Sequence, residues 1–269
     1  MNQRLLIFLS TCLNVCLTSC VVYQPTQCAA PQITGPKQAE ITAGSYLNGR
    51  YEFSGTYSPL PHLLVRASTG SLQNDSRNGN DSAYYRGQHY DFGLGTYWRL
   101  GSQWVVGGLG GFGQARNEAA YSTGGFIFGY PTRHKFDARY NKLFGEAYGI
   151  VQLSEAFALG AAYRVTQVNF TTLTDRNLPV DLSNMTRSEP MFFMRVRPGE
   201  GPTEDRPVQL QAAWGTSATF GYSEKDPNRT YAPGVSDLKQ SRGYTTIGIT
   251  VFPHLLFRKA QMPPASGGR

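Results

Sequence analysis

The residues with the most suggestive chemical spacing are Gly108-Leu109-Gly110-Gly111-Phe112-Gly113, which satisfy the pattern G-x-G-x-x-G. In a dinucleotide-binding enzyme this turn follows a strand and precedes a helix whose N-terminus holds the pyrophosphate. Here Gly124, Gly129 and Pro131 leave room for only about one or two helical turns after Gly113. We therefore predict a glycine-rich strand, in which the missing side chains make room for bulky neighbours.

Histidine, serine and acidic residues form no local pattern that is typical of catalysis or metal binding. The histidines match neither H-x-x-x-H nor H-E-x-x-H, and no G-x-S-x-G occurs. His89 and Asp91 share one face of a predicted strand, where a structural pair is more common than a catalytic relay. Glu204-Asp205 lies in a turn rich in Gly and Pro, where we expect solvent around it. We predict no enzyme, no cofactor and no metal site; the enzymatic alternative is a barrel-type lipase with a Ser/His pair.

The N-terminus has the pattern of an export signal that ends in a modified cysteine. Arg4 precedes a stretch that stays largely apolar to Leu17 and is too short to span a bilayer comfortably. Leu17-Thr18-Ser19-Cys20 resembles a lipobox, in which the cysteine is acylated and becomes the first residue of the mature chain. We predict that residues 1–19 are removed and that Cys20 carries diacylglycerol and an acyl chain such as palmitate. Residues 20–36, without periodicity, are predicted to form a tether; an ordinary signal peptide is the alternative.

Composition narrows the class of protein further. Cys12 and Cys16 fall in the predicted signal peptide and Cys20 at its end, so Cys28 has no partner for an intramolecular disulfide. Aromatic residues make up 13% of the chain and charged residues only 16%, while the mean hydropathy is −0.35. The net charge of +7 is spread along the chain, and an exported protein rarely meets nucleic acid. We therefore predict no nucleic-acid partner.

Apolar residues alternate with polar or small residues in one segment after another. In the second predicted strand, for example, Tyr51 and Phe53 alternate with Arg50 and Glu52. A soluble β-sandwich packs the apolar face on another sheet, whereas a membrane β-barrel turns it to lipid and the polar face to the lumen. The alternation alone leaves both folds open.

The lengths of the connections favour the barrel. We predict ten strands, at residues 37–44, 46–57, 62–70, 84–99, 103–115, 136–152, 156–170, 190–197, 207–221 and 243–252. Short and long connections alternate, as in outer-membrane barrels with short periplasmic turns and long extracellular loops. The sequence therefore predicts a single antiparallel up-and-down transmembrane β-barrel over residues 37–252, with a tail at 253–269. Eight strands is the alternative if the first connection, near Gly44-Ser45, and the first strand are misread.

Charged and polar residues share the face that a barrel turns to its lumen. The set predicted to form a lumen network is Arg50, Glu52, His89, Asp91, Arg99, Lys142, Glu146, Arg164, Arg195 and Arg197. A barrel of about eight strands has an interior just filled by side chains, so ten strands leave little space open. We predict that these mixed charges pair and plug the lumen; a path for conduction is the alternative.

Several short motifs carry a family resemblance. Besides the lipobox, they are Tyr23-Gln24-Pro25-Thr26, Pro36-Lys37-Gln38-Ala39-Glu40 and Leu47-Asn48-Gly49-Arg50-Tyr51-Glu52-Phe53. With them the chain resembles the small, mostly uncharacterised outer-membrane β-barrel lipoproteins of Bacteroidetes-type bacteria. The resemblance implies a lipid-anchored barrel in the outer membrane of a Gram-negative bacterium and no catalytic residues.

The sequence leaves four functions open. The favoured one is a structural or interaction protein, embedded in outer-membrane lipid, that displays long extracellular loops to partners the sequence does not identify. A narrow pore or carrier for small solutes is the main alternative. A soluble periplasmic lipoprotein with a ligand-binding β-domain and an enzyme at the outer membrane are the others.

Overall fold

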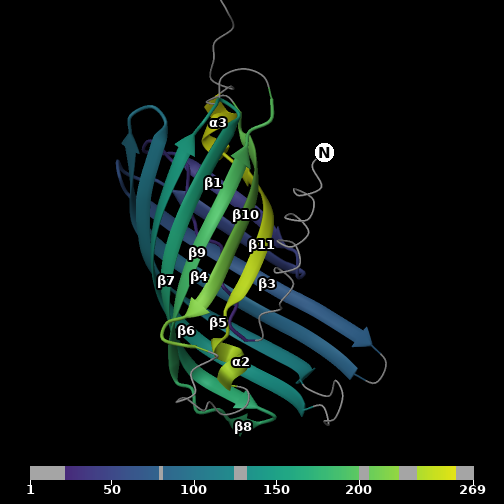
Figure 1. Cartoon of the computed structure of the whole chain (residues 1–269). Helices are drawn as coiled ribbons and strands as arrows, with labels where there is room; N and C mark the ends of the chain where they lie inside the picture. The colour runs from purple at the N-terminus through teal and green to yellow at the C-terminus, as the bar shows by residue number, and fades with distance from the viewer. Residues whose placement is uncertain (1–21, 79–80, 124–131, 200–205, 224–234, 259–269) are drawn as a thin grey trace, which may run out of the picture.

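A computed structural model of the chain describes residues 22–78, 81–123, 132–199, 206–223 and 235–258. The described residues form a closed antiparallel β-barrel (Figure 1). Its ten long strands are β1 (Ala39–Tyr46), β2 (Arg50–Tyr57), β3 (Leu64–Asn78), β4 (Asp81–Leu100), β5 (Trp104–Thr123), β6 (Thr132–Gln152), β7 (Phe157–Asp175), β9 (Asn184–Val196), β10 (Val208–Thr219) and β11 (Arg242–Val251).

Each long strand pairs with its neighbour in the sequence, and β1 closes the barrel by pairing with β11. The short strand β8 (Leu178–Pro179) pairs only with the end of β7. This topology confirms the predicted up-and-down barrel of ten strands. No helix among the described residues is long and apolar enough to cross a membrane.

The outward face of the strands forms an apolar belt around the barrel, as the alternation predicted. In β4 the outward positions from Tyr90 to Trp98 carry no charge. The larger exposed side chains of the belt are Ile41, Tyr51, Phe53, Tyr57, Val65, Tyr90, Phe92, Leu94, Trp98, Trp104, Phe112, Leu143, Leu159, Tyr163, Phe192, Met194, Val196, Leu210, Trp214, Ile247 and Ile249. Phe252, the residue after β11, is buried, with the guanidinium of Arg197 over its ring.

Five neighbouring strands continue well beyond the belt at one end. We call this extension the apron; it consists of residues 71–78, 81–88, 114–123, 132–141 and 167–175 of β3 to β7. Figure 1 shows these strands passing the ends of β10 and β11. Long loops were predicted at 71–83 and 116–135, and those boundaries are wrong because the polar residues there continue the strand ladders. Outside the belt, polar outward side chains meet water and need no loop.

The two ends of the barrel differ in their connections. The apron end carries β8 and the helix α2 (Val235–Lys239), and we call it the long-loop end. The opposite, short-turn end carries the connections at 58–63, 101–103 and 153–156 and the helix α3 (Pro253–Arg258), which begins the predicted tail. The first hairpin turns at 47–49, not at Gly44-Ser45 as predicted, because Gly49 takes the positive φ of 83° that the turn requires.

The glycine run Gly108–Gly113 lies inside β5. Gly107 and Gly111 point inward, where a Cβ on Gly107 would overlap the Tyr148 hydroxyl and one on Gly111 would overlap the Phe144 ring. The run continues as strand to Thr123 without a helix. Its glycines therefore make room for aromatic side chains of β6, as predicted, and the dinucleotide site is absent from this part of the chain.

Candidate functional site

The lumen holds the largest concentration of buried charge in the described part of the chain. Its side chains come from the inward positions of every long strand, because successive residues of a strand point to opposite faces. The predicted network residues that are buried there are Arg50, Glu52, His89, Asp91, Lys142, Glu146, Arg164, Arg195 and Arg197. The tenth, Arg99, is exposed at the short-turn end, where it donates to the carbonyls of Gly101 and Ser102. Arg99 is therefore no part of the network, because its strand position lies past the closed section of the lumen.

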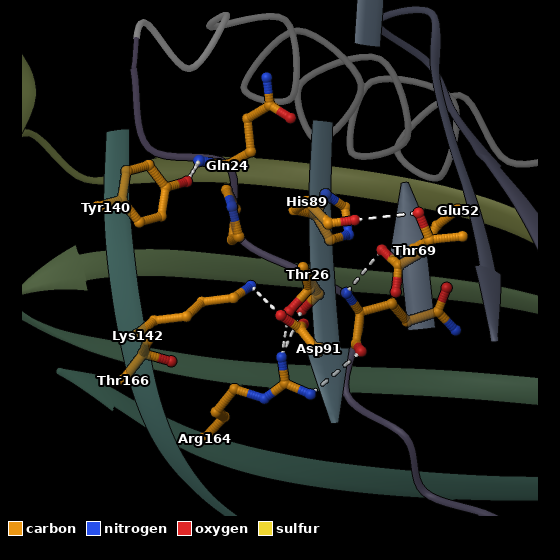
Figure 2. A network of polar contacts seen from close by, with 12 residues as sticks. Gln24, Thr26, Glu52, Thr69, His89, Asp91, Tyr140, Lys142, Arg164 and Thr166 are labelled. Carbon is orange, nitrogen blue, oxygen red and sulfur yellow. Dashed lines mark hydrogen bonds and ion pairs between the residues drawn. The ribbon is translucent and has the colours of Figure 1, made fainter. Parts of the chain in front are cut away.

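The N-terminal segment, residues 22–36, runs through the middle of this network. Val22, Tyr23, Thr26, Cys28 and Ile33 are each at most 5% exposed, although the segment has no regular secondary structure. Figure 2 shows it passing between side chains that reach in from several strands. The prediction of a free tether is therefore wrong for these residues, because a linker-like composition does not reveal that the segment lies in the lumen.

Glu146 and Arg164 form the centre of the network. The Arg164 Nε and Nη2 atoms lie 2.9 and 2.5 Å from Glu146 Oε2, and both side chains are essentially inaccessible to solvent. The second carboxylate oxygen, Oε1, accepts a hydrogen bond of 2.7 Å from the Ala29 amide. Arg164 also donates to the Thr26 hydroxyl and to the Gln27 carbonyl, the latter at 3.3 Å. The pair thus joins two wall strands to the segment.

A second ion pair links β4 to β6. Lys142 Nζ lies 2.8 Å from Asp91 Oδ1, and both side chains are 2% exposed (Figure 2). His89, one inward position away, is buried against Gly70, where any Cβ would overlap its imidazole ring. Neither His89 ring nitrogen has a hydrogen-bond partner among the described residues. Although His89 and Asp91 share a strand face as predicted, the partner of Asp91 is Lys142.

Glu52 collects a third group of contacts near the first hairpin. It accepts hydrogen bonds from the Tyr46 hydroxyl at 2.7 Å and from the Gln27 amide at 3.2 Å. Two guanidinium groups flank it, Arg50 at 3.7 Å and Arg66 at 3.8 Å. Arg50 in turn donates to the Pro25 carbonyl at 2.5 Å. A buried backbone amide or carbonyl needs a hydrogen-bond partner. Charged side chains of the wall supply these partners to the segment.

Four further charged residues belong to the network but escaped the sequence analysis: Glu40, Arg66, Arg187 and Glu189. Glu189 accepts hydrogen bonds from Tyr23, Thr166 and Ser217 at 2.8 to 2.9 Å. Arg187 donates to Ser217 and to the carbonyls of Lys239 and Gln240. Residues 184–189 were predicted as loop, but they belong to β9, with Met185, Arg187 and Glu189 buried. Apolar and polar residue types do not alternate there, so only the pairing with β7 shows that the strand begins at Asn184.

Amide side chains close the lumen at the short-turn end. Gln32 lies at their centre; its side chain bonds to Gln152 at 2.6 Å and to Gln209 at 2.9 Å. Its backbone amide donates to Glu40 at 2.8 Å. Around Cys28 the remaining cavity is about 10 Å³, which is room for about one water molecule. Among the described residues, the segment therefore packs closely against the wall beside Cys28, and a wider pocket of about 450 Å³ opens below Gln32 at the short-turn end.

The interior of the apron is filled differently, by apolar side chains. Val22, Phe136, Ala138, Leu173, Leu182 and Leu238 form one buried cluster. Tyr121 packs on Phe136 and His134, and its hydroxyl donates to Asp237 of α2 at 3.0 Å. Burial, and then the Asp237 carboxylate, raise the pKa of Tyr121, so this phenol stays protonated.

This arrangement can hold the N-terminal segment. Among the described residues, no group of three or more His, Cys, Asp or Glu side chains is placed to hold a metal ion. Glu204-Asp205, the acidic pair of the sequence analysis, lies outside the described residues, as does Cys20. The chemistry that the geometry supports is electrostatic: charged side chains on the wall bind the backbone of the segment.

Comparisons with known proteins find similarity of fold only. No protein-family model matches the chain, and no curated protein matches it. Solved structures that resemble it include the translocator domain of the autotransporter NalP from Neisseria meningitidis, with 10% identity over 80% of this chain and 86% of that one, and a TM-score of 0.43. The outer membrane protease OmpT from Escherichia coli matches at 11% identity over 81% and 94% of the two chains, with a TM-score of 0.40. The NanC porin matches at 10% identity over 79% and 98%, with a TM-score of 0.33.

Proposed function

We propose that this protein is a non-enzymatic outer-membrane β-barrel whose own N-terminal segment closes its lumen and whose long-loop end is displayed at the cell surface. Its proposed role is structural or one of protein interaction: a rigid wall presents the apron and the connections of the long-loop end to partners outside the cell. The observation that carries the proposal is the burial of residues 22–33 inside the barrel, bound by side chains of the wall.

The outward belt supports a location in a membrane. Large apolar side chains such as Phe53, Leu94 and Ile247 are each more than half exposed, which is unfavourable in water over so wide a surface. The opposite faces of the same strands carry the buried charges, which is the arrangement of a transmembrane barrel. The belt argues against the soluble periplasmic alternative, because a soluble β-domain would cover this face with a second layer.

The short-turn end is assigned to the periplasm and the long-loop end to the outside, following the usual build of outer-membrane barrels. β1 begins and β11 ends at the short-turn end. In this orientation the barrel therefore starts and ends on the periplasmic side. Outward polar residues of the apron, such as Gln88 and Arg116, then lie above the membrane in water.

Conductance across a planar lipid bilayer tests the closed lumen. The mature chain, residues 20–269, is expected to insert without carrying a steady ion current. A matched variant that lacks residues 22–33 is expected to conduct, since it removes the only segment that crosses the lumen in the described part of the chain. Heat-modifiable mobility on a gel verifies that both forms are folded. A steady current through the intact chain would contradict the proposal.

Lipidation of Cys20 is a separate part of the proposal and rests on Leu17-Thr18-Ser19-Cys20. Cells fed a labelled palmitate analogue are expected to label the protein, and C20A is expected to lose the label while its barrel still shows heat-modifiable mobility. The variant C28A is the matched control and should keep the label. Equal labelling of C20A and the parent chain would contradict lipidation of Cys20.

A narrow pore remains the second candidate, and one observation favours it. The buried charged residues comprise eight Lys or Arg and five Asp or Glu among the described residues, so the wall exposed on departure of the segment would be polar and cationic. Such a wall would wet and favour anions over cations. The deletion variant distinguishes the two candidates. An anion-selective current that is present only in the deletion variant supports the plugged barrel. An anion-selective current of equal size in the intact chain supports the pore.

A further inference from the structure

We infer that the N-terminal segment leaves the barrel at the long-loop end, so that the mature N-terminus and the acyl chains of Cys20 belong to the outer leaflet of the outer membrane. This inference rests on the proposed location and orientation of the barrel. A lipobox ordinarily suggests an anchor on the periplasmic side, and the path of residues 22–36 makes that anchor position incompatible with the fold.

The direction of the segment follows from its contacts along a single strand. β6 runs from the long-loop end at Thr132 to the short-turn end at Gln152. The backbone amide of Gln24 bonds to Tyr140, and that of Ala29 bonds to Glu146. The side chain of Gln32 then reaches Gln152. The segment therefore runs parallel to β6, from the long-loop end down to the short-turn end, where β1 begins.

The upper end of the segment lies above the belt. The Val22 carbonyl accepts a hydrogen bond of 2.5 Å from Asn117 Nδ2. Asn117 is in the apron part of β5, past Phe112, the last belt residue of that strand. Val22 also packs in the cluster that contains Leu238 of α2, the helix at the long-loop end. The point where the described chain starts is thus at the outer mouth of the barrel.

Chain length prevents Cys20 from reaching the other side. Cys20 lies two positions before Val22, with Val21 between them, and two fully extended residues span at most about 7 Å. The apolar band of an outer-membrane barrel is about 25 Å tall. The lumen is also already filled by the segment itself, which leaves no second path back. An acyl chain on Cys20 can therefore enter only the leaflet next to the long-loop end.

Accessibility of single cysteines in intact cells tests this inference. Each variant carries C28S, and a thiol reagent that does not cross the outer membrane is added to whole cells. V21C reports the N-terminus. L178C, on exposed β8, is the control for the long-loop end, and S102C, in an exposed turn, is the control for the short-turn end.

The expected result is labelling of V21C and L178C in intact cells, and loss of labelling of S102C until the outer membrane is permeabilised. If V21C needs permeabilisation or stays unlabelled while L178C reacts, the inference is overturned and the proposed orientation stands. If L178C is protected in intact cells and S102C is not, the proposed orientation itself fails. Heat-modifiable mobility shows which variants are folded.

The native Cys28 gives a second measurement that needs no substitution. Its thiol is 1% exposed among side chains of the lumen, so a maleimide is expected to label it only after the barrel is unfolded. A free tether on the outside or in the periplasm would leave the thiol reactive in the folded protein. Labelling of Cys28 in the folded barrel would therefore overturn the passage through the lumen even if V21C fails to fold.

Discussion

The lumen at the height of the belt and the interior of the apron are enclosed by the same strands, yet they are filled by opposite kinds of side chain. At belt height Arg164, Glu146, Lys142 and Asp91 surround the N-terminal segment. In the apron, Phe136, Leu173 and their neighbours form an apolar cluster. The two regions differ in what they enclose. The lumen at belt height encloses a backbone with many polar groups, whereas the apron encloses the inner faces of strands and loops.

Burial alone does not decide the residue type. A segment without secondary structure brings unpaired amides and carbonyls into the lumen, and each needs a hydrogen-bond partner. Apolar side chains cannot supply those partners, whereas carboxylates and guanidinium groups can. In the apron the strands satisfy their own backbone through their ladders, so apolar packing is sufficient there.

The largest effect is expected from breaking the central ion pair. E146L leaves the Arg164 guanidinium and the Ala29 amide buried without their partner, which should lower the free energy of unfolding by about 3–5 kcal/mol. Urea unfolding of the detergent-refolded barrel, followed by heat-modifiable mobility, measures the change. The double variant E146L/R164M should recover part of the loss because it removes the unpaired charge. A double variant no more stable than E146L would contradict this explanation.

A slightly smaller effect is expected in the apolar region. L173A opens a cavity in the apron cluster and should cost about 3 kcal/mol. Leu143 is the matched control, because it points outward from β6 and is 60% exposed; L143A opens no internal cavity. The same unfolding assay compares the two. Equal losses for both variants would mean that the apron cluster is not a packed core.

The boundary between the two regions offers a third test. N117A removes the hydrogen bonds to the Val22 carbonyl and to the Tyr140 hydroxyl, at 2.5 and 3.1 Å. The expected cost is about 2 kcal/mol, and N117D distinguishes the lost donor from lost volume. The rate of Cys28 labelling should also rise in N117A, because the upper end of the segment is held less firmly. An unchanged rate would show that Asn117 stabilises the wall and not the segment.

The smallest effect is expected on the outer surface of the apron. Arg86 and Asp75 form an ion pair of 3.2 Å whose side chains are 55% and 39% exposed. R86A should change the free energy of unfolding by less than about 1 kcal/mol, and less again at high salt. A loss as large as that of E146L would contradict the contrast between buried and exposed charge that the other variants test.

Much of the wall could be predicted because each strand carries its own alternation. Tyr51 and Phe53 had to face away from Arg50 and Glu52, whatever the partners of β2 were. The strand ends were harder to predict. At 71–83 and 116–135 the polar residues resembled loops, since neither strand face is strongly apolar there, and only the pairing with neighbouring strands shows that they continue the ladder.

The ten-stranded barrel was predictable from local features: each strand has an apolar and a polar face because its period of two is local, and short and long connections alternate between the strands. The content of the lumen, by contrast, became evident only from the folded chain. Residues 22–36 have neither periodicity nor charge, so nothing local indicates their place. Their position depends on partners far away in the sequence, such as Asn117, Glu146 and Arg164, whose charges and donors meet the segment only after the strands have closed around it.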